Sequence, residues 1–309
     1  MSLNRRQILT YAAAACSLPA MASAASDNKP MQFIVPFGPG GSGDISARML
    51  AEWITKKTGR SVVVENKPGA NGIIGVEAAR KAPADGSVLL LATTSTHLAN
   101  PYLFKKLPYD PGKDFRLVGT FGTGSFYILV NPSAPYKTLA NFVQAAKANP
   151  GKLNYGYFNA TSSVTAAMFA ATAGITLTGV PYKQVGQAMT ELMAGQIQVV
   201  FTDSVQGDPF VTSGQLHALA VHSAARLKRF PNIPLFRESY PKFDVSAGLL
   251  GLAVPAATPV ATQQELNDMI NDAVTSEPVK SRLEGFGFTP YRASLADLVK
   301  FEQAERAKW

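Results

Sequence analysis

The stretch IVPFGPGGSGDISARML (residues 34–50) decides the fold, because three local signals follow one another within it. Its first residues, together with Phe33, are apolar and predict a short buried strand. A loop dense in Gly and Pro comes next, and Ile45, Met49 and Leu50 then recur at the spacing of a core-facing helix. Strand, loop and helix in this order are typical of an α/β fold.

Four glycines in this loop predict a site for an anion. Gly38, Gly40, Gly41 and Gly43 let the backbone approach a ligand closely. The first N–H groups of the helix that follows lack partners within the helix and lie at the positive end of its dipole. We therefore expect the loop to hold a carboxylate. The alternative is a purely structural turn, because the G-x-x-x-x-G-K-[ST] phosphate motif is absent and G-x-G-x-x-G fits only loosely.

Length and charge narrow the class of protein. With 309 residues, of which 46% are hydrophobic, the chain is long enough for a large core and its length favours two lobes over one. The formal net charge is +8, but Lys and Arg are scattered and form no basic run, so we expect no nucleic-acid binding. A mild positive field favours anionic small molecules instead.

Residues 1–25 predict an export signal that is removed. Arg5 and Arg6 precede an apolar, Ala-rich run too short to span a membrane, and ASA at residues 22–24 is an A-x-A cleavage pattern. We expect cleavage near Ala24 or Ala25. The paired arginines resemble a twin-arginine signal, and Sec export remains the alternative. The only cysteine lies in this segment, so the mature chain would have no disulfide and no Cys-ligated metal.

Strand and helix patterns alternate along the rest of the chain and restart once. Strand, loop and helix at 153–173 repeat the outline of 33–54. The C-terminal helices need a sheet to cover, so we expect the chain to cross to a second lobe near Val130 and to return near Leu250. The predicted organisation is a signal peptide at 1–25, a first lobe of 26–129 plus 250–309, and a second lobe of 130–249.

A run of hydroxyl side chains, TTSTH at residues 93–97, follows the third predicted strand. Ligands in open α/β sheets collect at the carboxyl ends of the strands. Because this run and the glycine loop leave the same edge of the sheet, we expect both to line one cleft. The alternative is that the hydroxyls cap a following helix.

Six segments resemble the Bug-type periplasmic receptors of tripartite tricarboxylate transporters, and the resemblance covers nearly all of the mature chain. These segments are IVPFGPGGSGDISAR (34–48), VVVENKPGANGIIG (62–75), LPYDPGKDF (107–115), LVNPSAPYKTLANFV (129–143), NPGKLNYG (149–156) and VPYKQVGQAMTELMAGQIQVVF (180–201).

The resemblance implies a two-lobed, type II-like periplasmic-binding-protein fold of the α/β class, with a ligand cleft between the lobes and two hinge crossings. It implies a periplasmic receptor that binds a small organic carboxylate and delivers it to membrane permease subunits. We expect this receptor to be monomeric and to use no cofactor and no metal. A di- or tricarboxylate and an aromatic acid both remain open as ligands. A sensor that docks to a signalling partner would share the same fold and is the alternative function.

Carried onto this sequence, the resemblance places the ligand between the glycine loop, the loop after the third strand and the matching loop of the second lobe. We add Asp203, which follows a second-lobe strand. The candidate ligand-binding residues are Phe37, Gly38, Gly40, Gly41, Ser42, Gly43, Asp44, Thr94, Ser95, Thr96, Phe158, Asn159, Thr161, Ser162, Ser163 and Asp203.

Several of these residues have a structural alternative. Asp44 would repel a bound anion unless Arg48, four residues on, pairs with it. We expect Asp44 to be mostly structural, or to recognise a ligand amine or an ordered water, and Asp203 to act likewise from the second lobe. Phe37 and Phe158 either face an apolar ligand body or pack in the core. Ser162 or Ser163 is a natural helix N-cap.

An enzyme is the rival class, and the sequence argues against it. The three histidines, His97, His217 and His222, show no H-x-x-x-H spacing, so we expect no metal site. No G-x-S-x-G motif indicates a serine hydrolase. Ser95 with His97 is the one conceivable nucleophile–base pair, and sequence neighbours rarely form one.

Overall fold

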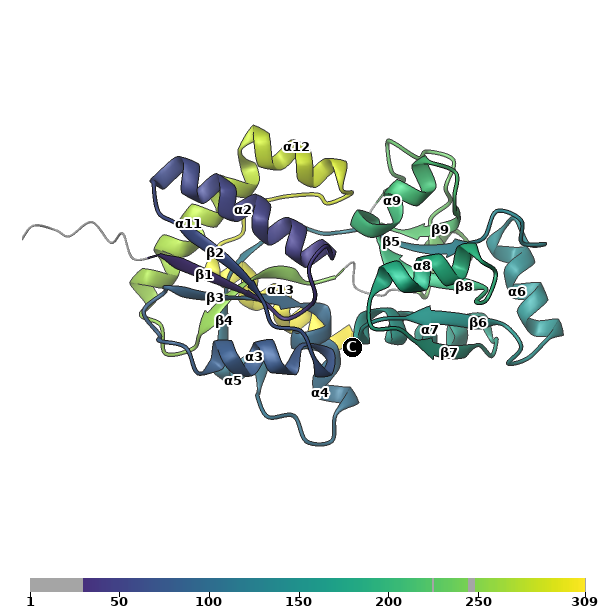
Figure 1. Cartoon of the computed structure of the whole chain (residues 1–309), viewed down its shortest axis with the longest axis horizontal. Coiled ribbons are helices and arrows are strands. Elements are labelled where there is room, and N and C mark those ends of the chain that lie inside the picture. Colours follow the sequence, from purple (N-terminus) through teal and green to yellow (C-terminus); the bar gives the residue numbers. More distant parts are fainter. Residues whose placement is uncertain (1–29, 224, 244–247, 309) are drawn as a thin grey trace, which may run out of the picture.

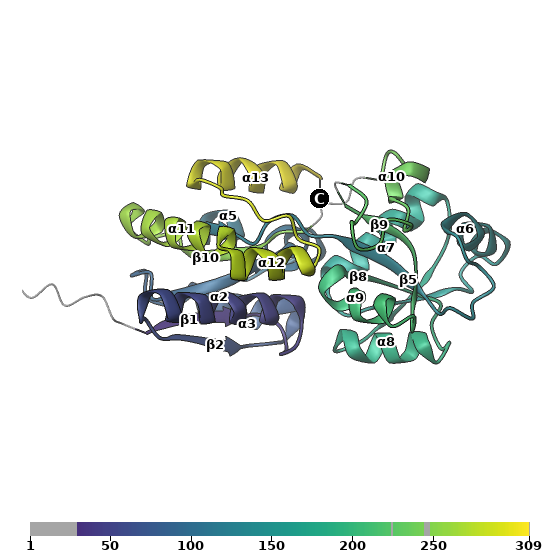
Figure 2. The same cartoon turned by 90° about the horizontal axis from the view of Figure 1, so that it is seen from above.

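The computed structural model describes residues 30–223, 225–243 and 248–308. In these ranges the chain forms two α/β lobes, each built on a five-stranded sheet (Figure 1). The lobes also separate clearly when seen from above (Figure 2). The predicted export signal, its cleavage site and Cys16 lie outside the described residues. None of the described helices is long and apolar enough to cross a membrane.

The first sheet has the strand order β2-β1-β3-β10-β4. Its parallel part consists of β1 (Met31–Val35), β2 (Val62–Asn66) and β3 (Val88–Thr93). The strand β10 (Leu250–Pro255) runs antiparallel between β3 and β4 (Phe115–Thr120). The carboxyl ends of β1, β2 and β3 therefore share one edge of the sheet.

Helices cover both faces of this sheet. One hydrophobic core joins it to α2 (Ser42–Thr58), α11 (Val260–Thr275) and α12 (Glu277–Gly285). The other face packs against α3 (Ile73–Arg80) and α13 (Leu295–Lys308). A sheet covered on both faces requires strands that are apolar on both sides, which is what the sequence of β1 and β3 supplies.

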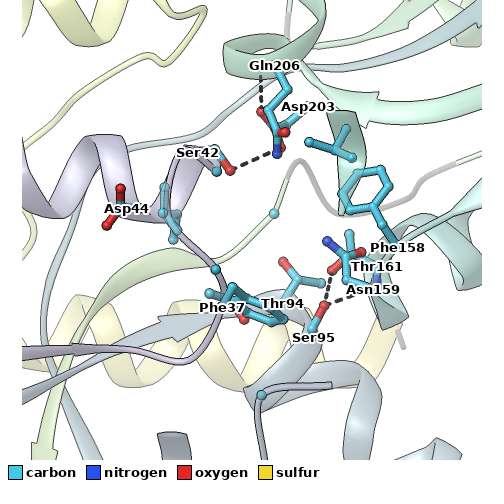
Figure 3. A pocket seen from close by; sticks show the side chains of 18 of the residues that line it. Phe37, Ser42, Asp44, Thr94, Ser95, Phe158, Asn159, Thr161, Asp203 and Gln206 are labelled. Carbon is cyan, nitrogen blue, oxygen red and sulfur yellow. Dashed lines mark hydrogen bonds between the residues drawn. The ribbon is translucent and has the colours of Figure 1, made fainter. Parts of the chain in front are cut away.

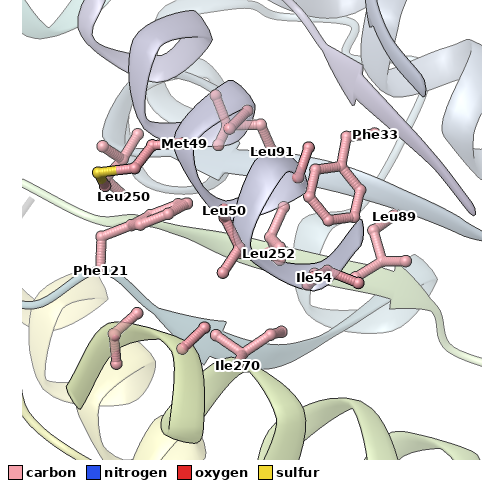
Figure 4. Close-up of a cluster of buried hydrophobic side chains, with 14 of the residues drawn as sticks. Phe33, Met49, Leu50, Ile54, Leu89, Leu91, Phe121, Leu250, Leu252 and Ile270 are labelled. Carbon is pink, nitrogen blue, oxygen red and sulfur yellow. The ribbon is translucent and has the colours of Figure 1, made fainter. Parts of the chain in front are cut away.

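The core beneath α2 shows how the opening stretch folds (Figure 4). Phe33 of β1 and Leu50 and Ile54 of α2 are fully buried together with Leu89 and Leu252. Full burial of one such side chain stabilises the fold by about 1.5–3 kcal/mol. Because successive strand residues point to opposite faces, Phe33 enters this core while the next residue packs on the other face. The start of α2 is thereby fixed over the carboxyl end of β1.

The second sheet has the order β7-β6-β8-β5-β9. Its parallel strands are β6 (Asn154–Tyr157), β7 (Thr178–Pro181) and β8 (Val199–Asp203). Antiparallel to β8 and to β9 (His217–His222) lies β5 (Phe126–Val130). Both sheets thus consist of parallel strands with an antiparallel strand inserted, in agreement with the predicted repeat.

Four helices accompany the second sheet, and short helical turns occupy several loops. The four helices are α6 (Leu139–Ala148), α7 (Ala160–Ala173), α8 (Val185–Met193) and α9 (Ser204–Thr212). The shorter elements are η1 (Ala70–Gly72), η2 (Thr94–Ala99), α4 (Asn100–Leu103), α5 (Pro111–Asp114) and α10 (Phe236–Ser239).

The chain enters the second sheet earlier than the sequence predicts. It leaves the first sheet at Thr120 and joins the second at Phe126, whereas the predicted crossing lay near Val130. The reason is that β5 pairs with β8 and β9, and its Ile128 is fully buried in the core of the second lobe. An apolar strand such as β5 fits either sheet, so the pattern alone did not assign it. The strand β10, which begins at Leu250, belongs to the first sheet.

Two segments of the second lobe differ from expectation. No helix was predicted at α9, because Gly207 and Pro209 interrupt its pattern. Residues 226–242 contain several prolines and charged residues, a composition typical of a surface stretch, yet Leu235 and Phe236 are buried there. In both cases tertiary packing overrides a weak local signal.

Candidate ligand-binding site

A cavity of about 630 Å³ lies between the lobes, and residues of both lobes line it (Figure 3). Its walls come from loops at the carboxyl ends of β1, β2 and β3 on one side and of β6, β7 and β8 on the other. This is the place where an open α/β sheet binds its ligands. Among the described residues no group of three or more His, Cys, Asp and Glu side chains could hold a metal ion.

The glycine loop forms the first wall. Gly41 is the N-cap of α2 and has no side chain to cap it, so the first N–H groups of the helix are left without a capping acceptor. Gly43 has a packing reason as well, because a Cβ there would lie 2.4 Å from Leu91 Cδ2. Gly40 has φ +80° and does not line the cavity. The loop therefore leaves the backbone N–H donors at the start of α2 without a side-chain partner, and packing against Leu91 requires glycine at position 43.

Asp44 holds this loop in place. Its carboxylate accepts hydrogen bonds from Gly40 N at 3.0 Å, from Arg48 Nε at 3.0 Å and from Asn66 Nδ2 at 3.0 Å. Asn66 also donates to Phe37 O, which ties the end of β2 to the loop. Burial raises the pKa of Asp44, but these hydrogen bonds and the Arg48 charge outweigh it and hold the pKa below its usual value. The predicted pair with Arg48 is present.

The hydroxyl run after β3 serves both predicted purposes. The Thr93 hydroxyl caps η2 by accepting from Thr96 N at 3.3 Å, and Thr93, Thr94 and Ser95 line the cavity. Thr94 Oγ1 accepts from Leu249 N at 2.7 Å, which links this loop to the segment before β10. Thr96 is fully buried and lies outside the cavity wall, contrary to its expected ligand role.

His97 and Ser95 do not form a nucleophile–base pair. The Ser95 hydroxyl bonds to Thr161, whereas His97 Nδ1 bonds to Thr96 Oγ1 at 3.0 Å. His97 is buried beside the Phe115 ring. Burial, together with the charge of Arg306, lowers the pKa of His97 to about 3. A neutral buried imidazole here is a packing residue.

The second-lobe loop is capped by Asn159 rather than by a serine. Asn159 Oδ1 accepts from Ser162 N at 2.8 Å, and Ser162 Oγ accepts from Asn159 N at 3.3 Å, which together form a capping box at the start of α7. Ser162 is fully buried, and neither it nor Ser163 lines the cavity. Phe158, Asn159 and Thr161 do line it. The ligand role predicted for Ser162 and Ser163 is thus not supported by their positions.

Hydrogen bonds cross the cleft at two points (Figure 3). Ser42 Oγ donates to Asp203 Oδ2 at 3.0 Å. Ser95 Oγ and Thr161 Oγ1 share a hydrogen bond of 2.8 Å, and Thr161 N donates to Ser95 Oγ at 3.2 Å. Both contacts join one lobe to the other across the cavity. The lobes are therefore closed on each other at the site.

Asp203 also caps α9. Its Oδ1 accepts from Gln206 N at 3.2 Å, and Gln206 Nε2 approaches Oδ2 at 3.4 Å. Burial raises the pKa of Asp203 above its usual value. No ion pair among the described residues includes this carboxylate. Asp203 is thus a partly buried acid on the cavity wall with no cationic neighbour.

Of the sixteen predicted residues, Gly40, Thr96, Ser162 and Ser163 lie off the cavity wall. Those that line it are Phe37, Gly38, Gly41, Ser42, Gly43, Asp44, Thr94, Ser95, Phe158, Asn159, Thr161 and Asp203.

Several lining residues were missed by the sequence reasoning. The turn at residues 68–72 follows β2, and the rule that ligands collect at strand ends would have found it. Residues 182–185 follow β7 in the same way. No local signal pointed to the others, because they come from the crossings, from α9 and from the segment after α12. They are Gly124, Ser125, Phe126, Gln206, Gly248, Leu249, Leu250 and Phe288.

Fold and site together define a two-lobed solute-binding protein with its ligand cavity between the lobes. The family model "Tripartite tricarboxylate transporter family receptor" matches residues 46–309, and the chain belongs to this family. The protein BugT of Bordetella pertussis is 32% identical over 286 residues, which cover 91% of this chain and 87% of BugT.

Solved structures agree with this assignment. A protein of R. palustris solved with adipate has a TM-score of 0.86 and 26% identity, with 91% of this chain and 94% of that chain covered. The periplasmic binding protein BugD has a TM-score of 0.83 and 27% identity, with 91% and 95% covered. The chain is accordingly a Bug-type periplasmic solute-binding receptor, and this family consists of receptors rather than enzymes.

Proposed function

We propose that the chain binds one small organic carboxylate in the cavity between its lobes and delivers it to the permease subunits of a tripartite tricarboxylate transporter. The observation that carries this proposal is the cavity itself, which residues of both lobes line and which hydrogen bonds close on two sides. A solute held there would add contacts to both lobes at once. Its binding would therefore favour the closed arrangement, which a permease can recognise.

The chemistry of the wall supports a carboxylate. The hydroxyl and amide groups of Thr94, Ser95 and Asn159 supply donors to a ligand carboxylate. The uncapped start of α2 supplies further backbone N–H donors to polar groups of the solute. No arginine is among the lining residues that the structure describes. Recognition through neutral donors on rigid loops suits a solute that must be released again. The adipate in the R. palustris relative supports the same class of ligand.

Aromatic side chains leave the body of the ligand open. Phe37 and Phe158 flank the cavity, and Phe126, Tyr182 and Phe288 also line it. Such walls accept an aliphatic chain or an aromatic ring. We further propose that the twelve predicted residues on the cavity wall contact the ligand, that the mature chain is a monomer, and that export removes residues up to Ala24 or Ala25.

A thermal-shift screen of residues 26–309 tests this proposal. The panel holds mono-, di- and tricarboxylates, aromatic acids and amino acids. A ligand that binds only the native state raises the melting temperature in proportion to the logarithm of its concentration. We expect at least one acid to do so. The lack of a shift with every acid would contradict the proposal.

A cavity-filling variant and a matched control test whether the ligand that raises the melting temperature binds in the cavity. Ser42→Leu places a bulky side chain at the cleft, where Ser42 now meets Asp203. Ser281→Leu makes the same exchange on an exposed position of α12, away from the cavity. We expect the shift to vanish in the first variant and to persist in the second. An unchanged shift in Ser42→Leu would place the site elsewhere.

A further inference from the structure

We infer that the ligand carries a protonated nitrogen in addition to its carboxylate, with the nitrogen held by Asp203 and the carboxylate held at the opposite side of the cavity by Asn159. This inference rests on the proposed function and narrows its ligand from organic acids in general to amino-carboxylates. It separates this receptor from a receptor for simple diacids.

The charges on the cavity wall are unbalanced. Three charged side chains line it: Asp44, Asp203 and Lys183. Asp44 is neutralised by Arg48, whose NH2 lies 2.9 Å from its Oδ1. Lys183 is exposed to solvent. Asp203 is therefore the one lining carboxylate in the described chain without an ion-pair partner, so its ionised form has no side-chain cation to balance it inside the closed cleft.

The side of the cavity that holds Asp203 is suited to a cation. Ser42 and Gln206 surround the carboxylate and occupy part of its acceptor capacity. A carboxylate offers about four lone-pair directions, and the three hydrogen bonds from Ser42 and Gln206 leave about one of them for a ligand. Figure 3 shows these three side chains together at one side of the cavity. A ligand carboxylate placed there would face a like charge in a site of low dielectric constant, which is strongly unfavourable.

The opposite side is suited to an anion. Thr94, Ser95, Asn159 and Thr161 lie there, across the cavity from Asp203 (Figure 3). The Asn159 carbonyl oxygen is used by the α7 cap, while its Nδ2 has no hydrogen-bond partner among the described residues. Nδ2 is a donor only. The two sides therefore differ in kind, with an acid at one and neutral donors at the other.

The simpler explanation is that Asp203 is only the cap of α9. A cap requires an acceptor, and Asn, Ser or Thr supplies one without a charge. The helix dipole and the hydrogen bonds from Ser42 and Gln206 stabilise a charged cap here, but they supply no ion pair for a carboxylate that closure of the cleft removes from water. A ligand with a protonated nitrogen restores the balance when the cleft closes. The cap and the recognition of the nitrogen use different lone pairs of one carboxylate, so both roles fit the same residue.

Two sets of matched acids test the inference. In the first set, phenylalanine, 3-phenylpropanoate and benzylmalonate share a skeleton and carry an ammonium, a hydrogen or a second carboxylate at one carbon. In the second, 6-aminohexanoate, hexanoate and adipate vary the far end of one chain in the same way. Isothermal titration calorimetry of residues 26–309 gives each Kd. We expect the ammonium member to bind at least about tenfold more tightly than both of its counterparts, as one charge-assisted contact provides.

The variant Asp203→Asn keeps the shape of the side chain and an acceptor for the Gln206 N–H, and removes only the charge. We expect it to abolish the preference, so that the Kd of the ammonium member approaches the Kd values of its two counterparts. The matched control Asp272→Asn, at an exposed ion pair with Arg292, should keep the preference. If Asp203→Asn folds poorly, the ratio of Kd values between the ammonium member and its counterparts in the wild-type protein still tests whether the ligand carries a protonated nitrogen.

Each outcome separates the two proposals. Tighter binding of a diacid or of a plain acid than of its ammonium counterpart would overturn this inference and leave the proposed function intact. A preference that survives in Asp203→Asn would overturn the role of Asp203. Failure of both sets and of the broader acid screen would overturn the proposed function itself.

Discussion

Replacing Asp44 tests whether one buried carboxylate holds the ligand loop in its binding shape. Asp44 is 5% exposed and accepts hydrogen bonds from the backbone of Gly40 and from the side chains of Arg48 and Asn66. Asp44→Ala removes the acceptor and leaves the Gly40 N–H and the Asn66 amide without their partner. Asp44→Asn keeps the shape and one acceptor oxygen.

The magnitude follows from these bonds. A hydrogen bond to a charged group contributes about 1.5–3 kcal/mol, and the Arg48 contribution is smaller because its side chain is exposed. The Gly40 and Asn66 bonds alone therefore predict that Asp44→Ala lowers the free energy of unfolding by about 3–5 kcal/mol, and Asp44→Asn by about half as much. Because Gly40 precedes the donors of Gly41 and Ser42, we also expect the Kd for the ligand to rise at least about tenfold in Asp44→Ala.

The assay is urea unfolding followed by tryptophan fluorescence. Trp53 lies on α2, the helix that begins at the loop. In a Trp309→Phe background it is the only tryptophan, because the chain has two. Circular dichroism on the same samples checks that one transition describes the unfolding. Asp268→Ala, on the exposed face of α11, is the control. A loss below about 1 kcal/mol in Asp44→Ala would refute the reasoning, since it would mean that the buried bonds contribute little.

Three further predictions concern the crossing, a buried histidine and a cap. Gly122 has φ +106°, and a Cβ there would lie 2.3 Å from Thr289 O, so Gly122→Ala should lower the unfolding free energy by about 2 kcal/mol or more. Gly186→Ala, where a Cβ meets no atom within 4 Å, should be neutral or stabilising in the same urea assay. Burial lowers the pKa of His97 from its ordinary value of 6.5 to about 3 in the folded protein. Between these two values the unfolded chain binds more protons, so the free energy of unfolding falls as the pH drops through that window. The free energy of unfolding should be about 2 kcal/mol lower at pH 5 than at pH 8, and this difference should be smaller in His97→Gln. An equal free energy of unfolding at the two pH values would contradict this prediction. Ser162→Ala should lower the unfolding free energy by about 1 kcal/mol, because it removes one side of the capping box, and should leave the ligand Kd unchanged. Weakened binding at full stability would show instead that Ser162 contacts the ligand.

Sequence patterns predicted the lobes well where burial and periodicity agree. The strand, glycine loop and helix at residues 31–58 were recognisable from two local patterns. The apolar run around Phe33 is typical of a buried strand, and the apolar residues around Leu50 recur at the spacing of an amphipathic helix. The assignment of β5 to a sheet was not recognisable. Its pairing with β8 and β9 joins residues that are far apart in the sequence, and an apolar strand pattern does not indicate which strands it will pair with.

The residues of the candidate site also fall into two groups, those that local patterns predicted and those that only the tertiary fold brings to the cavity. Loops at strand ends, such as Gly41 to Asp44 and Thr94 to Ser95, were predicted because their position on the sheet edge follows from local patterns. For Ser162 the sequence left a ligand role and a capping role open, because it shows a polar residue near a helix start but not the direction of its side chain; in the structure Ser162 takes part in the capping box. Gln206 and Phe288 were missed, because only closure of the two lobes brings them to the cavity.

The central claim is that the ligand lies between the lobes. A crystal structure of residues 26–309 with the acid that gives the largest thermal shift tests it most directly. We expect electron density for the acid in the cavity, with its carboxylate within hydrogen-bond distance of Asn159 or Ser95 and both lobes in contact with it. Density for the acid at any other place, with the cavity occupied only by water, would contradict the account.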